Sequence, residues 1–295
     1  MNYRLAHFSD FHFAAEDDDF ARGCALLDDA IENGADHLVV TGDIADAAQI
    51  EVVSGLVAHL DRQGWASAVR LTIVPGNHDI FPLSWNSVPS FGRPTSRYEQ
   101  FLDATRASRR GTRRLVKGDD FPFAKELAPD VVLVGLDSTR NGQYNPLCWA
   151  EGELPAAHRR AVTKFFGAQS GAAHRIIAMH HHPWPEDFEH GWIEQNFTEP
   201  EPAVVEAWLR ESGATLTLCG HVHEKSSIES RTLARRCRVL RSGTAGGVDD
   251  LDDEGNKRRI YHLIDLTPSG RLSVVRREFN DGRKAPKKTR RPRRA

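Results

Sequence analysis

The sequence lacks the features of a membrane-spanning or secreted protein. No apolar run approaches the roughly 20 residues that a helix needs to cross a bilayer. The first ten residues, MNYRLAHFSD, contain no apolar signal-peptide segment and lead directly into a predicted strand. The four cysteines are scattered without a CxxC pair, which is typical of reduced, mostly structural thiols. These absences predict a cytoplasmic protein with no membrane span.

Most of the chain also lacks the excess of basic charge that a nucleic-acid-binding surface needs. The formal net charge is -2, from 39 Lys and Arg against 41 Asp and Glu. Residues 283–295 hold eight of the basic residues and no acidic one, which leaves 31 basic against 41 acidic residues, a net charge of about -10. Because an acidic body repels a phosphate backbone, nucleic acid is not the favoured partner, although the basic tail keeps it as an alternative.

Apolar runs alternate with helical patterns through the first part of the chain. Strands are predicted at residues 3–8, 38–40 and 71–74, with helices over 20–33 and 47–63 between them. This alternation predicts a largely parallel start to a sheet. Later strands are predicted at residues 131–136, 176–179 and 216–219, and later helices at 155–169 and 202–212.

The remaining segments depart from this alternation. Four short alternating segments, at 226–230, 239–242, 259–266 and 272–279, predict antiparallel strands that finish a second sheet. Residues 81–120, which contain Pro, Trp, Gly and six Arg or Lys between 106 and 117, are interpreted as an insertion over the site with a helix over 96–107. We therefore expect one domain over residues 1–280 and a disordered basic tail over residues 281–295.

Residues that can bind metal follow five of the predicted strands. They are Asp10 and His12; Asp43; Asn77 and His78; the run His180, His181 and His182; and His221 with His223. Side chains two apart share a face of a strand, so each D-x-H or H-x-H pair can point toward one ion. Oxygen and imidazole ligands suit Mn, Fe or Zn and not a thiolate-type structural zinc site.

Each motif has a plain structural alternative, in which the histidines are satisfied loop residues and the acids are helix caps. A lone D-x-H has about a one-in-ten chance of being functional, as a rough prior for a short motif. Five motifs in order, each at the end of an apolar run, leave that alternative little room.

The motif series D-x-H, G-D, G-N-H-D, H and G-H-x-H resembles the calcineurin-like metallophosphoesterases over about residues 3–245. The resemblance implies an α/β fold, a four-layer α/β/β/α sandwich of two mixed sheets that carries two divalent metal ions. It implies that one ion is held by Asp10, His12, Asp43 and His223. It implies that the other is held by Asp43, Asn77, His180 and His221, with Asp43 as the bridge. His78 is then a catalytic residue beside the leaving group or a phosphoryl oxygen, and not a ligand.

The H-H-H-P run resembles the bacterial class III branch of the family, which acts on cyclic nucleotides and glycerophosphodiesters. In that branch the first histidine is the ligand, which implies His180. Strand alternation agrees, because Ile176, Ala178 and His180 share a face. His181 and His182 are left as substrate-binding groups, as neighbours of the ligands or as turn residues.

Two cations about 3.5–4 Å apart clamp phosphate oxygens and lower the pKa of a bridging water, whose hydroxide attacks phosphorus in line. The expected function is a metal-dependent phosphoester hydrolase, and specifically a phosphodiesterase on a small-molecule phosphoester such as a cyclic nucleotide or a glycerophosphodiester. The alternatives are a phosphomonoesterase or nuclease of the same family and, less favoured, a non-catalytic scaffold. The sequence does not indicate the oligomeric state.

Several further residues have two interpretations. Asp79 either orients His78 or caps the following turn, and Asp46 is expected to be a helix N-cap and not a partner of a ligand. The arginines between residues 106 and 114 are expected to form a solvated helix face, with a phosphate site as the alternative. Three aromatic residues are expected to pack locally and not to stack on a base: Trp85, Phe91 and Trp184.

Overall fold

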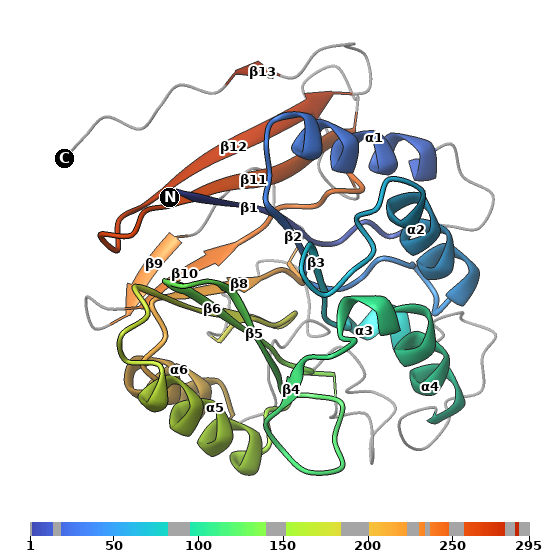
Figure 1. Cartoon of the computed structure of the whole chain (residues 1–295). Coiled ribbons are helices and arrows are strands. Elements are labelled where there is room, and N and C mark those ends of the chain that lie inside the picture. Colours follow the sequence, from blue (N-terminus) through green and yellow to red (C-terminus); the bar gives the residue numbers. More distant parts are fainter. Residues whose placement is uncertain are drawn as a thin grey trace.

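The protein is described by a computed structural model in which residues 2–13, 19–81, 95–139, 152–183, 201–222, 230–233, 237–247, 257–280 and 287–288 are placed. Two β-sheets pack face to face, and helices cover the outer face of each (Figure 1). The predicted four-layer α/β/β/α arrangement of two mixed sheets is therefore confirmed.

The first sheet joins the N-terminal strands to a C-terminal hairpin in the order β13-β12-β11-β1-β2-β3. Its strands are β1 Tyr3–Phe8, β2 His37–Val40, β3 Leu71–Ile73, β11 Arg258–Leu266, β12 Leu272–Asn280 and β13 Lys287–Lys288. The first three are parallel, as predicted, and β11 is antiparallel to β1. Helices α1 (Asp19–Glu32) and α2 (Ile50–Arg62) cover its outer face (Figure 1).

The second sheet has the order β4-β5-β6-β7-β8-β10-β9. Its strands are β4 Arg113–Arg114, β5 Phe123–Ala128, β6 Val131–Gly135, β7 His174–Ala178, β8 Leu216–Cys219, β9 Ser230–Leu233 and β10 Cys237–Arg241. Strands β6, β7, β8 and β10 are parallel. Helices α5 (Ala156–Ala168) and α6 (Glu201–Glu211) cover the outer face of this sheet (Figure 1).

Three apolar cores separate the four layers, one under each pair of helices and one between the sheets. Strand β7 shows how alternation serves two of them. Ile176 and Ala178 face the core between the sheets, while Ile177 and Met179 face the helical core. The next residue on the inner face is His180, so the strand delivers that imidazole into the space between the sheets.

Several strands differ from the expectations. The β11–β12 hairpin completes the first sheet and not the second, because β11 pairs along the free edge of β1. Strand β10 is parallel to β8, not antiparallel. The short strand β4 lies within residues 81–120, for which only a helix is predicted, and β13 lies within the tail that is expected to be disordered. A polar/apolar alternation identifies a strand without identifying its neighbour, which explains the first two differences.

The remaining helices connect the layers. They are α3 Asn77–Ile80, α4 Thr95–Ala104 and the short 3-10 helix η1 Arg106–Ser108. In the described part of the chain, no helix is both long and apolar enough to cross a membrane.

Candidate metal centre

The loops after β1 and β2 hold three predicted ligands in an unusual backbone conformation. Asp10, His12 and Asp43 have φ values of 57°, 46° and 52°, in the left-handed region that residues other than glycine rarely adopt. Two hydrogen bonds fasten the loops together: the Asp10 N–H donates to the Gly42 carbonyl at 3.1 Å and the His12 N–H donates to the Asp43 carbonyl at 3.0 Å. Such strain persists where the surroundings fix it, and it is common at functional sites.

Close approach of the loops requires glycine at two positions. Gly42 has φ +87°, and a Cβ atom there would lie 2.4 Å from the Gly76 nitrogen. A Cβ atom on Gly220 would lie 1.8 Å from the Ser9 hydroxyl and 2.4 Å from Asp10 Oδ2. The absence of a side chain at Gly220 therefore lets the backbone approach Ser9 and Asp10 closely.

Asp79 connects the second and third loops. Its Oδ2 accepts hydrogen bonds from the Gly76 and Asp43 N–H groups, both at 2.9 Å, and its Oδ1 accepts from Ile44 and Ala45 at 2.8 and 3.0 Å. Asp79 thus caps the start of α3, the turn to which it belongs and not the following one, and it also fixes the loop that carries Asp43. Burial and the neighbouring Asp43 carboxylate raise the pKa of Asp79, and the backbone donors oppose that shift.

Four potential ligand atoms meet around His180. Its Nε2 lies 3.0 Å from Asn77 Oδ1, 3.1 Å from His221 Nδ1 and 3.2 Å from Asp43 Oδ2. Its Nδ1 donates to the Thr41 carbonyl at 2.7 Å, so in the neutral ring Nε2 carries a lone pair. A lone pair that faces two oxygen acceptors and a second imidazole is satisfied by a proton or by a metal cation. The residues around His180 therefore fit a divalent metal ion.

The second predicted ion position lies on the other side of Asp43. His12 Nε2 is 3.8 Å from Asp10 Oδ1 and 3.7 Å from Asp43 Oδ2. Asp43 Oδ2 thus faces both His12 and His180, which is the geometry that a bridging carboxylate needs. The carboxylates of Asp10 and Asp43 and an imidazole nitrogen of His180 also lie within 4.8 Å of one another. This donor set of oxygen and imidazole suits Mn, Fe or Zn.

The role expected for Asp46 was wrong. Helix α2 begins at Ile50, and its N-cap is Gln49. Asp46 instead places Oδ1 3.5 Å from His12 Nδ1, where a carboxylate fixes the orientation of a ligand imidazole. The cap was expected because an acid ahead of a helical pattern is the usual capping signal, but residues 47–49 are not helical.

His221, the first histidine of the G-H-x-H motif, is fixed by hydrogen bonds to Asp10. The His221 N–H donates to both oxygens of Asp10, at 3.2 and 3.1 Å, and its φ is 80°. His221 Nε2 is buried and has no hydrogen-bond partner in the described part of the chain. His223 lies outside the described residues, so its role as a ligand stays a prediction.

His78 lies at the edge of the carboxylate cluster, and its ring forms a group with His12 and Asp43 whose ligand atoms lie within 4.8 Å of one another. Its N–H donates to Asp43 Oδ1 at 2.8 Å, and its ring Nδ1 donates to the Asp46 carbonyl at 2.7 Å. The His12 and His78 rings meet edge to face, with centroids 4.6 Å apart. The side chain of His78 is 20% exposed, whereas that of His12 is 2% exposed. His78 is thus more exposed than His12, and its catalytic role stays a prediction.

The charges of the cluster are unbalanced without a cation. Burial lowers the pKa of His180, but the hydrogen-bonded Asp43 carboxylate outweighs burial and raises it to about 9. The same imidazole, against the effect of burial, holds the pKa of Asp43 well below its usual value. Burial lowers the pKa of His221, and so do the adjacent imidazoles. A proton shared by Asp43 and His180 therefore occupies the position that suits a metal ion.

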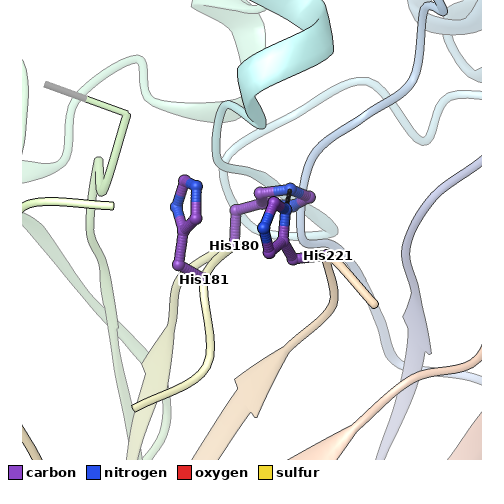
Figure 2. A group of neighbouring side chains, drawn as sticks. All are labelled: His180, His181 and His221. Atoms are coloured by element: carbon purple, nitrogen blue, oxygen red, sulfur yellow. Dashed lines mark hydrogen bonds between the residues drawn. The ribbon is translucent and has the colours of Figure 1, made fainter. Parts of the chain in front are cut away.

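The three consecutive histidines take different positions. Figure 2 shows His180 and His221 in contact, with His181 standing beside them on the loop after β7. The His181 ring centroid lies 5.0 Å from that of His180 and 4.5 Å from that of His221. His182 is fully buried and lies outside the candidate ligand groups of the described residues. Substrate binding by His181 and His182 stays a prediction at this point.

Sequence reasoning missed several groups that support the ligands. The Thr41 carbonyl accepts from His180, and the Thr244 hydroxyl and Gly246 N–H both donate to the Asp10 carbonyl. The glycine-rich loop over 243–247 thus lies beside the site. Ser138, which follows β6, contacts His181 at 2.8 Å. Its place at a strand end on the same edge of the sheet was the available signal.

Among the arginines between residues 106 and 114, two form ion pairs and a third contacts backbone carbonyls. Arg106 pairs with Asp103, and Arg114 pairs with Asp120 at 2.7 Å. Arg109 donates to the carbonyls that end α4, which is typical of a helix C-terminus. The arginines line a cavity of about 540 Å³. The three aromatic residues weighed for base stacking lie outside the described residues.

Comparisons with known proteins bear on the family and on the fold. Residues 3–225 match the family model described as calcineurin-like phosphoesterase. Curated protein sequences give no significant match. A dimetal phosphatase from Danio rerio aligns with a TM-score of 0.59 and 13% identity, over 94% of this chain and 95% of that chain.

Two further solved structures share the fold. A purple acid phosphatase from yellow lupin seeds has a TM-score of 0.58 and 10% identity, over 98% of this chain and 53% of that one. GAP50, described as the anchor in the inner membrane complex of Plasmodium, has a TM-score of 0.53 and 11% identity, over 99% and 90% of the two chains. At these identities the likeness shows the fold alone.

Proposed function

The chain belongs to the calcineurin-like phosphoesterase family, and on that premise we propose that it is a metal-dependent phosphodiesterase for small substrates. The observation that carries the proposal is the convergence of four ligand atoms at His180 Nε2, across two sheets. The proposed ligands of one ion are Asp10, His12, Asp43 and His223. Those of the other are Asp43, Asn77, His180 and His221.

When bound, two divalent cations supply the charge that attracts phosphate oxygens and the acidity that makes water a nucleophile at neutral pH. The protein itself positions the ligands and the residues around them. Asp43 Oδ2 faces both groups of ligands, while its Oδ1 is held by the His78 N–H. His78 is anchored through Nδ1 to the Asp46 carbonyl, which fixes the orientation of its ring. We assign it the role of contacting the leaving group or a phosphoryl oxygen.

The choice of a small diester rests on sequence features and not on the fold. The H-H-H-P run favours cyclic nucleotides or glycerophosphodiesters, and the acidic body disfavours a nucleic acid. GAP50 is described as an anchor, so the fold by itself does not imply catalysis. Against a scaffold role stands the donor set, because the described ligand residues converge and no apolar side chain replaces any of them.

The test is hydrolysis by protein stripped of metal and reloaded separately with Mn, Fe or Zn. The substrates are bis-(p-nitrophenyl) phosphate, p-nitrophenyl phosphate, cyclic nucleotides, glycerophosphodiesters and single- and double-stranded DNA. We expect diester cleavage by the loaded protein, with two metal equivalents by elemental analysis. Cleavage of the monoester alone would refute the diesterase, and cleavage of DNA in preference to the small diesters would favour a nuclease. A protein that binds two metal ions but cleaves none of these substrates would be a scaffold.

A further inference from the structure

A buried hydroxyl at the end of β6 contacts the second histidine of the run. Ser138 is fully buried, and its Oγ lies 2.8 Å from His181 Nδ1. The His181 backbone N–H donates to the same Oγ at 3.2 Å. Ser138 and His181 are thus joined by two contacts, although 43 residues separate them in the chain.

Hydrogen-bond accounting then fixes the His181 tautomer. Ser138 Oγ already accepts the His181 N–H, so its own hydrogen needs an acceptor, and a buried hydroxyl without one is costly. In the described part of the chain, His181 Nδ1 is the one acceptor in hydrogen-bond contact with this hydroxyl, so Nδ1 accepts from Ser138 and the ring proton lies on Nε2. The opposite tautomer would leave the buried hydroxyl hydrogen without a partner.

We propose that Ser138 holds His181 as the Nε2–H tautomer, so that His181 donates a hydrogen bond to a phosphoryl oxygen and is not a metal ligand. This inference rests on the proposed function. A ring nitrogen of His181 lies within 4.8 Å of the nitrogens of His180 and His221, close enough for one anion to touch the metal centre and this ring (Figure 2). The ligand class is the phosphoryl group shared by a phosphoester and by inorganic phosphate.

The competing assignment makes His181 a third imidazole ligand beside His180 and His221. Those three side chains form one of the groups that could hold an ion. A ligand nitrogen must carry a lone pair, so that assignment needs the proton on Nδ1 and Ser138 as its acceptor. Whether the ring proton of His181 lies on Nδ1 or on Nε2 therefore decides whether His181 is a metal ligand or a substrate-binding residue.

The first experiment reads that proton directly. The full chain is labelled with ¹⁵N-histidine and loaded with diamagnetic zinc, and long-range ¹H–¹⁵N spectra identify the tautomer, with His181 assigned from the His181→Gln spectrum. We expect Nε2–H in the wild type and a loss of this preference in Ser138→Ala. Nδ1–H, or a zinc-shifted Nε2, would overturn the proposal. Ser212→Ala is the matched control, because it also removes a buried serine hydroxyl of the second-sheet layers.

The second experiment compares His181→Gln with His181→Leu, in protein whose fold is checked by circular dichroism. A glutamine amide can still donate near the position of Nε2, and leucine cannot. We expect both variants to keep the metal content of the wild type. We expect the dissociation constant for inorganic phosphate to rise about 10- to 100-fold in His181→Leu and less in His181→Gln, the range for a hydrogen bond to a charged group. Loss of one metal equivalent, or equal phosphate affinity in both variants and the wild type, would refute the proposal.

These measurements stay separate from the test of the proposed function. A wild type that hydrolyses no phosphoester would remove the hydrolase, while the tautomer, the metal content and phosphate binding would still decide the role of His181. If the enzyme is active, His181→Leu should raise KM for the diester more than His181→Gln does.

Discussion

Two clusters of buried polar groups bridge the sheets, and they are satisfied in different ways. In the first, His180 Nε2 faces Asn77 Oδ1, Asp43 Oδ2 and His221 Nδ1, which are all potential acceptors. We call these four residues the metal-centre cluster. In the second cluster, His37 Nδ1 donates to the Val69 carbonyl at 2.8 Å, so its Nε2 accepts from the Thr72 hydroxyl at 2.8 Å. The Thr72 oxygen in turn accepts from Lys125 Nζ at 2.9 Å. We call His37, Thr72 and Lys125 the lysine cluster.

The contrast separates structure from function. In the lysine cluster, every donor in the contacts given above has an acceptor. Lys125 Nζ also donates to the Leu71 carbonyl at 2.5 Å. The lysine cluster therefore requires no ligand. The metal-centre cluster has more lone pairs than hydrogens, so it is completed only by a cation. Burial alone does not distinguish the two clusters, because His37 and His180 are both fully buried.

The largest expected effect comes from Asp43→Asn. The substitution removes the negative charge that faces both groups of ligands while keeping the side-chain volume. We expect bound metal to fall from two equivalents to one or none, and kcat/KM to fall at least about 1000-fold, because metal and carboxylate act as one unit. Elemental analysis and diester hydrolysis measure the two effects. Lys125→Met is the matched control from the lysine cluster, and full metal content with full activity in Asp43→Asn would contradict the assignment.

The loops that hold the metal-centre cluster should be far less tolerant than similar loops elsewhere. Gly42→Ala places a Cβ atom 2.4 Å from backbone at φ +87°, whereas Gly64→Ala, at φ +74°, meets no atom within 4 Å. We expect Gly42→Ala to cost at least about 3 kcal/mol of the free energy of unfolding, from strain plus overlap. Gly64→Ala should cost about 1 kcal/mol, from the left-handed backbone alone. Urea unfolding of both variants measures the difference, and equal costs would show that the overlap is relieved without strain.

Asp79→Asn tests whether the second loop depends on one carboxylate. An amide offers one acceptor oxygen, so about two of the four backbone N–H groups would lose their partner, and the amide hydrogens would face donors. We expect a loss of about 2–4 kcal/mol in the free energy of unfolding. Asp61→Asn, on the exposed face of α2, is the control and should change stability by less than about 0.5 kcal/mol. A loss in Asp79→Asn no larger than the control would show that the loop is held by other contacts.

Local sequence pattern identified some parts of the site and of the fold but not others. Asp10, Asp43 and His180 follow apolar runs at strand ends, so their type and place could be read from local pattern. The sheet to which β11 belongs could not, because pairing depends on which strand edge is free in the folded protein. The sequence did not reveal Ser138 as a partner of His181, and it indicated the wrong role for Asp46, for a related reason. A serine or aspartate has many local uses, and its partners here lie 43 and 34 residues away in the chain.

The lysine cluster gives the smallest expected effect, and its sign is fixed by linkage. Burial lowers the pKa of Lys125 well below its ordinary value, and the nearby Arg109 guanidinium adds to the shift. The unfolded chain therefore binds more protons than the folded protein between the lowered pKa and about 10.4, so the stability of the wild type rises with pH across that window. Lys125→Met lacks this contribution. The free energy of unfolding of the wild type minus that of Lys125→Met should increase by about 1 kcal/mol from pH 9 to pH 10, measured by urea unfolding. A difference that stays constant would mean that Lys125 keeps its ordinary pKa, and that the lysine cluster holds a charged ammonium in place of a neutral amine.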